Sequence, residues 1–287
     1  MTASLRPVRR RLYLMRHGRV DYFSDEVLRA RDHRVARLTE EGRAQAETAG
    51  VALAEPVITR AVSSGLARTR ETAEIVLAQR ARPPQLEDEP DLEEIRGGTI
   101  AFNGRAEAAM AMAAEFGRAH EPGARMFDGE SFAEAQARSI ESIRRLVLVD
   151  APSADRGATL VVAHEGVNRL ILSWACGAGL QAASAFEQDT CCVNVIDFDV
   201  APGGGNITRI IVKAVNMTPY NWLKHGMSRT SPEKRRPPAQ RPARLVSGPV
   251  RHHVAPPLRH GPHGPTHPGP IESVQWRTKS CPTRRRP

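Results

Sequence analysis

The sequence predicts an α/β fold, a three-layer α/β/α sandwich with a mostly parallel central sheet. Short apolar runs, typical of buried strands, alternate along the chain with longer segments of helical character. Such alternation is typical of a parallel sheet that helices cover on both faces. The hydrophobic fraction of 40% over 287 residues is enough for a substantial core. No apolar run reaches the length of a membrane span, so we expect no membrane partner.

The first half of the chain is expected to contain two strands and two helices. Residues 11–15 are a short apolar run, which predicts a buried strand. Thr39 is a suitable N-cap for a helix over 40–54, because two acidic residues occupy its first turn. A second strand is predicted at 57–63, and the helix that follows it at 66–79.

The second half continues the alternation and ends in two strands. Helices are expected at 104–118 and 131–149, and the second begins with Ser131 and Glu134 in the spacing of a capping box. The remaining predicted elements are a strand at 159–163, a helix at 166–176, and strands at 191–198 and 207–213. The turn between the last two strands is assigned to the proline and three glycines of residues 202–205.

Residues 224–287 differ sharply in composition from the rest of the chain. They hold 14 of the 41 Lys and Arg but only two acids, together with 13 of the 22 prolines and six of the ten histidines. Such a segment cannot bury enough apolar surface to offset its ordering entropy. The sequence therefore predicts a folded domain over 1–223 and a disordered tail over 224–287, and the net charge of +9 arises in the tail.

The cysteines and the N-terminal segment indicate the cellular compartment in which the protein is expected. The chain has four cysteines, Cys176, Cys191, Cys192 and Cys281. Their spacing fits neither a metal site nor a disulfide framework, and free thiols are typical of a reducing compartment. The N-terminal apolar run is too short for a signal peptide. We therefore expect a cytoplasmic protein.

Two predicted strands end in side chains that can do phosphate chemistry. Arg16, His17 and Gly18 follow the first strand, and His164 follows the strand at 159–163. Ligands of open α/β sheets bind beyond the carboxyl ends of the strands. Arginine matches phosphate with its forked donors, and histidine can attack phosphorus or move a proton. The alternative is a pair of polar strand caps, but only four histidines lie outside the tail and two of them follow strands.

Further segments accompany these residues in a fixed order. They are Ser63-Ser64-Gly65-Leu66-Ala67-Arg68-Thr69-Arg70-Glu71-Thr72-Ala73, then Leu92-Glu93-Glu94-Ile95, then Val161-Val162-Ala163-His164-Glu165-Gly166-Val167-Asn168-Arg169. Together with Arg16-His17-Gly18 they resemble the histidine phosphatase superfamily, in its phosphoglycerate-mutase-like branch. The first helix and Gly129-Glu130-Ser131 are also similar to family segments. The resemblance covers about residues 11 to 215.

The resemblance implies how a phosphoryl group is held. Arg16 and Arg68 would grip its oxygens, and His164 would donate a hydrogen bond to it in the transition state. Gly18 would let the backbone approach the anion, and Arg19 would form a second anion contact.

The resemblance also implies a two-step reaction without a metal or another cofactor. His17 would attack phosphorus and form a phosphohistidine, while Glu94 protonates the leaving oxygen and later acts as base toward water. Glu93 is the nearest competitor of Glu94, and Arg70 that of Arg68; Arg70, two residues further along a helix, would point to a different face. The expected substrate is a small phosphorylated metabolite.

Several alternatives remain open at this stage. A cofactor-dependent phosphoglycerate mutase shares the fold, but it usually needs a longer cap than residues 100–130 provide. A catalytically silent member with a basic, nucleic-acid-binding tail is the other alternative, although the tail has few aromatic residues for base stacking. Glu165 stands where relatives have a small residue or an amide; it either points away from the phosphate or selects a substrate with a positive group.

Arginines near the first predicted strand favour additional negative charge on the substrate. They are Arg19, Arg29, Arg31 and Arg34. The oligomeric state is not readable from the sequence.

Overall fold

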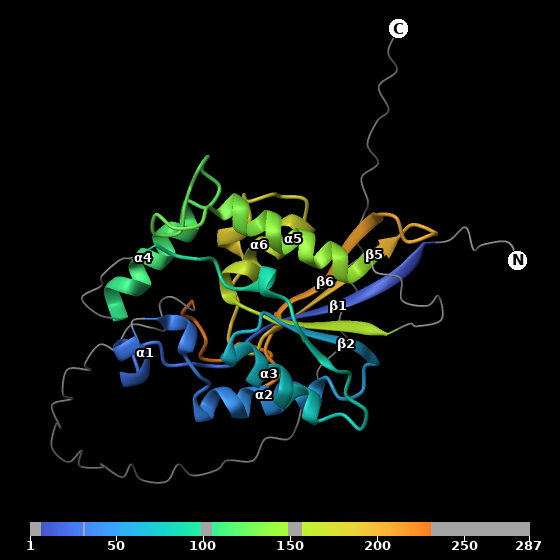
Figure 1. The fold of residues 1–287 in the computed structure, drawn as a ribbon, viewed down its shortest axis with the longest axis horizontal. Helices are drawn as coiled ribbons and strands as arrows, with labels where there is room; N and C mark the ends of the chain where they lie inside the picture. Colours follow the sequence, from blue (N-terminus) through green and yellow to red (C-terminus); the bar gives the residue numbers. More distant parts are fainter. Residues whose placement is uncertain (1–6, 31, 99–104, 149–156, 231–287) are drawn as a thin grey trace, which may run out of the picture. The chain divides into compact units, whose positions relative to one another are not determined.

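The computed structural model describes residues 7–30, 32–98, 105–148 and 157–230, and these form an α/β sandwich as predicted (Figure 1). The strands are β1 (Val8–Arg16), β2 (Ile58–Ser63), β3 (Leu86–Asp88), β4 (Ala158–Ala163), β5 (Val193–Val200) and β6 (Ile207–Met217). The helices are α1 (Asp25–Ala30), α2 (Glu40–Ala52), α3 (Ala67–Ala78), α4 (Arg105–Gly117), α5 (Phe132–Leu148) and α6 (Glu165–Ala175). Short 3₁₀ helices lie at His33–Val35, Pro90–Leu92 and Ala183–Ala185.

The six strands form one sheet in the order β3-β2-β4-β1-β5-β6. The four strands β3, β2, β4 and β1 run parallel, whereas β5 and β6 are antiparallel to their neighbours. A turn containing Gly203 and Gly204, both at positive φ, joins β5 to β6 as the sequence predicts. The mostly parallel sheet is thus confirmed, with an antiparallel hairpin at one edge.

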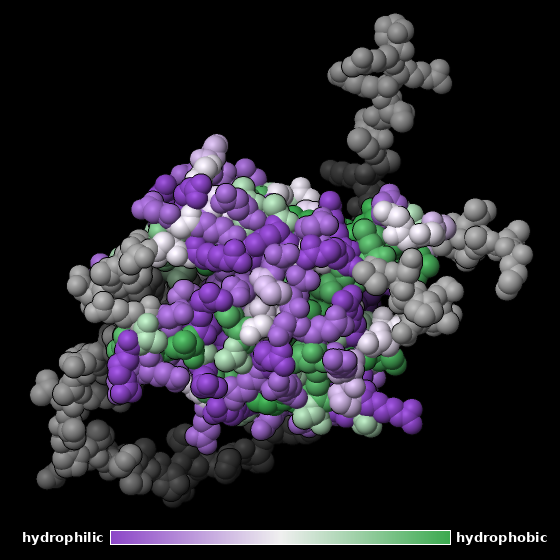
Figure 2. Space-filling model, viewed as in Figure 1, coloured by the Kyte–Doolittle hydropathy of each residue, from purple (hydrophilic) through white to green (hydrophobic). Residues whose placement is uncertain are grey.

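Helices cover both faces of the sheet, so the predicted three layers are confirmed (Figure 1). One hydrophobic cluster joins α2 and α3 to their face, around residues such as Val76 and Leu160. A larger cluster joins α5 and α6 to the opposite face, around Phe132, Leu170 and Phe198. Hydrophilic residues cover most of the face shown in Figure 2, for example over α5. None of the helices in the described ranges is long and apolar enough to cross a membrane.

The predicted helix boundaries agree with the structure to within two residues, and Thr39 caps α2 through a bond from the amide of Gly42. The predicted start of the strand at 191 is wrong: β5 begins at Val193, because Cys191 has a positive φ of 53° and turns the chain before the strand. The sequence also missed α1 and β3, which are too short to show a period. Residues 231–287, most of the predicted tail, lie outside the described residues.

Candidate active site

The parallel pairing of β1 with β4 brings the two strand-end histidines together. Arg16 is the register partner of Ala163, so His17 and His164 leave the sheet side by side. The amide of His17 donates to the carbonyl of Ala163 at 3.1 Å, and the two imidazole centroids lie 5.2 Å apart with planes at 65°. Both side chains are buried. The sheet therefore assembles the pair from positions far apart in the chain.

The ring of His17 is held in one orientation by the backbone of the next residue. Its Nδ1 lies 2.7 Å from the carbonyl oxygen of Gly18, which can only accept, so Nδ1 carries the proton. In the neutral ring Nε2 then carries the lone pair that a nucleophile needs. The hydroxyl of Tyr22 lies 3.4 Å from Nε2, a long contact that a substrate can displace.

His164 is oriented by a chain of hydroxyl groups. Its Nε2 lies 2.7 Å from Oγ of Ser64, which lies 2.9 Å from Oγ1 of Thr69, and Thr69 donates to the carbonyl of Leu66 at 2.8 Å. Since Thr69 has only one proton, Ser64 must donate to Thr69 and accept from Nε2 of His164. The neutral ring therefore carries its lone pair on Nδ1, which is buried and has no hydrogen-bond partner among the described residues.

The protonation of His164 is opposed by its surroundings. Burial, followed by the positive charge of Arg68, holds the pKa of His164 well below its ordinary value. A hydrogen bond from Nδ1 to a phosphoryl oxygen requires a second proton on the ring. The ring can take up that proton once an anion has offset the neighbouring guanidinium charges.

Arg68 and Arg70 occupy different faces of α3. Arg68 is fully buried, and its NH1 group donates to the carbonyls of His33 and Arg34 at 3.3 and 3.4 Å. Its Nε is buried and makes no hydrogen bond within the described part of the chain. Arg70, in contrast, is half-exposed and pairs with Asp88 at 2.6 Å. Anion binding by Arg68 rather than Arg70 stays a prediction, which the burial of Arg68 favours.

Arg16 is buried at the end of β1 between two acceptors. Its NH2 group lies 3.0 Å from Oε2 of Glu165, and its NH1 group donates to the carbonyl of Gln188. Burial by itself lowers the pKa of Arg16, but the nearby acidic groups, Glu165 first among them, together more than offset this, and the pKa is raised. Arg16 is therefore a permanent cation beside His17.

Glu94 lies at the N-terminus of α6, next to His164. Its carboxylate accepts from the amides of Gly166 at 3.1 Å and Val167 at 3.2 Å. A Cβ on Gly166 would lie 2.5 Å from Oε1 of Glu94, so only glycine permits this approach. Glu93, the competitor, faces away to Arg34 at 3.0 Å. The structure thus brings Glu94, rather than Glu93, to the helix terminus that follows His164.

A residue of α5 holds the segment that carries Glu94 in place through hydrogen bonds. The guanidinium of Arg138 donates to the carbonyls of Asp91, Glu93 and Glu94, at 2.6, 2.9 and 3.2 Å. The same guanidinium binds the carboxylate of Glu130 at 2.7 and 2.8 Å. This gives the Gly129-Glu130-Ser131 segment, noted in the sequence, a structural reason.

Two predicted phosphate contacts have other partners here. The amide of Gly18 donates to Oγ1 of Thr72 at 3.0 Å, and a Cβ on Gly18 would lie 2.5 Å from the carbonyl oxygen of Gly42 in α2. Close packing on α2 is therefore a sufficient reason for this glycine. The guanidinium of Arg19 pairs with Glu41 at 2.8 Å on the surface. Phosphate contact by Gly18 and Arg19 stays a prediction.

Glu165 points away from solvent and toward two guanidiniums. Its Oε2 faces Arg16, and its Oε1 lies 2.9 Å from Arg169. Only 4% of the residue is exposed, so it is not placed to meet a positive group on a substrate. The structure disfavours selection of a positive group by Glu165, whose carboxylate instead pairs with Arg16.

Sequence reasoning gave no role to Ser64, Arg138 and Gln188. Ser64 lies within a segment that was singled out, so a search for buried hydroxyls beside His164 could have found it. Arg138 and Gln188 act on or through backbone carbonyls, which the identity of a side chain does not reveal. Across residues 7–30, 32–98, 105–148 and 157–230, no group of three or more His, Cys, Asp or Glu could hold a metal ion. Metal independence nonetheless stays a prediction.

Comparison with known proteins gives one matching family model. It describes the histidine phosphatase superfamily (branch 1) and matches residues 12–210. The 2-carboxy-D-arabinitol-1-phosphatase of Triticum aestivum is 29% identical over 215 residues, which are 73% of this chain and 41% of that protein. A protein of Arabidopsis thaliana is 28% identical over 229 residues. The chain spans less than half the length of the curated relatives it matches.

Solved structures share the fold at lower identity. Mycobacterial hydrolase 1 is 24% identical with a TM-score of 0.59, and the match covers 73% of this chain and 99% of that one. The mycobacterial glucosyl-3-phosphoglycerate phosphatase is 22% identical with a TM-score of 0.58, again over 73% and 99% of the two chains. At these identities the similarity shows the fold alone.

Proposed function

The chain belongs to the histidine phosphatase superfamily, and we propose that it is a phosphomonoester hydrolase that acts through a phosphohistidine intermediate. The observation that carries the proposal is the pair of buried imidazoles 5.2 Å apart, of which His17 has its Nδ1 committed to a carbonyl. A tetrahedral anion that lies against the edges of both rings meets a nucleophile in one and a potential donor in the other.

In the first step, Nε2 of His17 forms a bond to phosphorus as the bond from phosphorus to the leaving oxygen breaks. Glu94 transfers its carboxyl proton to that oxygen, which leaves as an alcohol. Arg16 and Arg68 hold the equatorial oxygens, where charge develops. The unpartnered Nε of Arg68 is one donor that an oxyanion can engage.

In the second step, water takes the place of the alcohol. Glu94 removes a proton from the water as its oxygen bonds to phosphorus and the bond to Nε2 of His17 breaks. His164, protonated at Nδ1 when the anion is present, stabilises the charge in both steps. The net reaction consumes one ester and one water and releases one alcohol and one phosphate.

The proposed substrate is a small phosphorylated metabolite. The wheat relative is named for the 1-phosphate of a carboxylated sugar alcohol, which supports this class and no finer choice. Three of the four arginines that favoured a second negative charge are engaged elsewhere: Arg19 with Glu41, Arg34 with Glu93, and Arg29 with the carbonyl of Asp25. The fourth, Arg31, lies outside the described residues. A panel of phosphorylated sugars, sugar acids, amino acids and cofactor precursors, ranked by kcat/KM, would identify the substrate.

The decisive experiment combines turnover with trapping. The pure protein should release phosphate from an aryl phosphate and, when quenched in mid-reaction with labelled substrate, carry acid-labile phosphate on His17. The His17→Ala variant should lose both signals. Mutase activity on a phosphoglycerate without release of phosphate would overturn hydrolysis in favour of the mutase, and absence of any label would support a silent member of the fold.

We also propose that residues 1–223 are the catalytic domain and that residues 224–287 are a tail without a catalytic residue; its first residue, Lys224, contacts the domain through Asp189 at 3.0 Å. All the residues that contact the substrate in the two proposed steps lie between Arg16 and His164. Removing residues 229–287 should therefore leave kcat/KM within about twofold of the full chain. A large loss would show that the tail belongs to the catalytic unit.

A further inference from the structure

We propose that Glu165 is a positioning residue that sets the plane of the Arg16 guanidinium for the transition state. The proposal rests on the proposed phosphatase function and adds to it a residue that meets no substrate. A buried carboxylate directly after His164 contacts the arginine that ends β1.

Arg16 is fixed at two of its nitrogens. Glu165 binds NH2 at 3.0 Å, and the carbonyl of Gln188 accepts from NH1. A guanidinium is planar, so two anchors at different nitrogens determine both its plane and its direction. A carbonyl alone leaves the group free to pivot about one bond. The contact with the carboxylate of Glu165 therefore restricts the guanidinium of Arg16 to one orientation.

The anchor itself is rigid. Oε1 of Glu165 binds Arg169 at 2.9 Å, and Arg169 binds Glu187 at 2.9 Å while its guanidinium carbon lies 5.2 Å from the ring centre of Phe116. Arg16, Glu165, Arg169 and Glu187 thus form a row of alternating charges. Because both oxygens of Glu165 are engaged, its carboxylate cannot rotate without breaking an ion pair.

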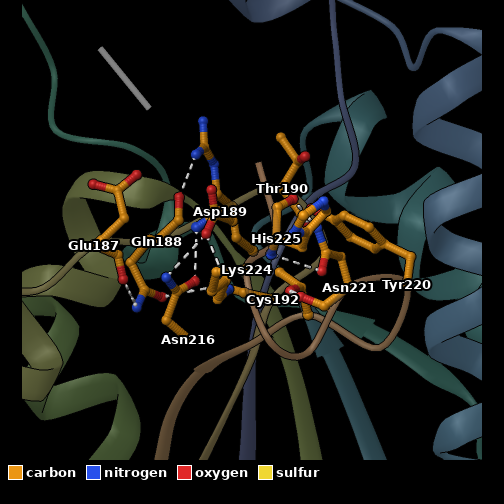
Figure 3. A network of polar contacts seen from close by, with 12 residues as sticks. Glu187, Gln188, Asp189, Thr190, Cys192, Asn216, Tyr220, Asn221, Lys224 and His225 are labelled. Carbon is orange, nitrogen blue, oxygen red and sulfur yellow. Dashed lines mark hydrogen bonds and ion pairs between the residues drawn. The ribbon is translucent and has the colours of Figure 1, made fainter. Parts of the chain in front are cut away.

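The carbonyl anchor is equally well held. Gln188 exchanges side-chain hydrogen bonds with Asn194, at 3.1 and 2.8 Å. The next residue, Asp189, is buried and binds Lys224 and Asn216, each at 3.0 Å (Figure 3). Figure 3 also shows the carboxylate of Glu187 turned away from this cluster. Both supports of Arg16 therefore belong to fixed networks.

The pairing of Glu165 with Arg16 should affect the binding of phosphate and the stabilisation of the transition state differently. A carboxylate beside Arg16 reduces the net positive charge that attracts a phosphate dianion, so it cannot serve tight ground-state binding. A fixed guanidinium matters most when the equatorial oxygens move and gain charge in the transition state. Removing the charge of Glu165 should therefore slow chemistry without weakening the binding of phosphate.

The test compares Glu165→Gln with the wild type. On an aryl phosphate, kcat should fall about 10- to 100-fold, less than for outright loss of a transition-state donor, because Arg16 remains but loses its fixed orientation. KM should change less than about threefold. In calorimetry, the Kd of orthovanadate, which adopts the geometry of the transition state, should rise by the same factor as kcat falls. The Kd of inorganic phosphate should stay constant or decrease. Equal weakening of phosphate and vanadate would overturn the proposal.

A double-mutant cycle tests whether Glu165 acts through Arg16. In an Arg16→Lys background the ammonium has no plane to fix, so Glu165→Gln should change vanadate affinity by less than about twofold. Additive losses would mean that Glu165 works by another route. Since vanadate binding needs no turnover, this arm decides the proposal even if the protein proves to be inactive on every phosphoester.

A charge-balanced variant serves as the control for loss of stability in Glu165→Gln. Breaking a buried ion pair is strongly destabilising, whereas replacing both partners is often tolerated. The double variant Glu165→Gln/Arg169→Gln removes the pair together and should show the same vanadate loss with a smaller loss of thermal stability. Glu121→Gln, which breaks an exposed pair with Arg118, is the matched surface control and should change neither constant.

Discussion

Replacing Ser64 by alanine keeps the imidazole of His164 in the site but removes the hydroxyl group that orients it. The hydroxyl of Ser64 is fully buried and joins Nε2 of His164, at 2.7 Å, to Oγ1 of Thr69. Its removal leaves a buried N–H and a buried hydroxyl oxygen each short of a partner. A buried polar group that loses its partner costs about 1–3 kcal/mol, so the free energy of unfolding should fall by about 2 kcal/mol.

Ser64→Ala should lower activity as well as stability. Without the acceptor at Nε2, the ring of His164 can rotate or change tautomer, and Nδ1 no longer has a fixed direction. A loss of about 1.4–2.8 kcal/mol of transition-state stabilisation corresponds to a 10- to 100-fold fall in kcat/KM. The assay is steady-state hydrolysis of an aryl phosphate, with urea unfolding measured on the same preparation.

Ser63 offers a matched control one residue away. It is also fully buried, but its hydroxyl donates to Asp88 at 2.8 Å and accepts from the amide of Gly65. Ser63→Ala should lose about 1–2 kcal/mol of stability and keep kcat/KM within about threefold. If the two variants lose activity equally, the hydroxyl chain has no special role in orienting His164, and the reasoning from its hydrogen bonds is refuted.

Three further predictions address Arg68, the pH dependence of stability and the start of α5. Arg68→Met should lower kcat/KM about 100- to 1,000-fold, whereas Arg70→Met, which breaks a half-exposed pair with Asp88, should change it less than threefold in the same assay. Because the pKa of His164 is held well below 6.5, the unfolded chain binds more protons below that pH, so stability should fall as the pH drops from about 7 to 5. Urea unfolding should show a smaller slope with pH for His164→Gln, and an unchanged slope would contradict the assignment. Ser131→Ala should lose about 1 kcal/mol in urea unfolding, since Ser131 and Glu134 form the capping box of α5; no loss would mean that the box is not stabilising.

The fold could be predicted because its signals are local. Apolar runs mark the buried strands, and Thr39 and Ser131 cap their helices through bonds to residues only three positions away. Elements without a full period, such as β3 with three residues, give no such signal. The start of β5 was misplaced because the left-handed turn at Cys191 depends on its surroundings rather than on a glycine.

The sequence by itself determined the α/β class, the order of most helices and strands, and the residue types that end β1 and β4. Only the tertiary structure decided which nitrogen of each histidine carries the proton, and that Glu165 faces Arg16 and Arg169. The physical reason is that propensity and periodicity act over a few neighbouring residues. Hydrogen-bond partners and ion pairs, in contrast, depend on the register of strands that are far apart in the chain.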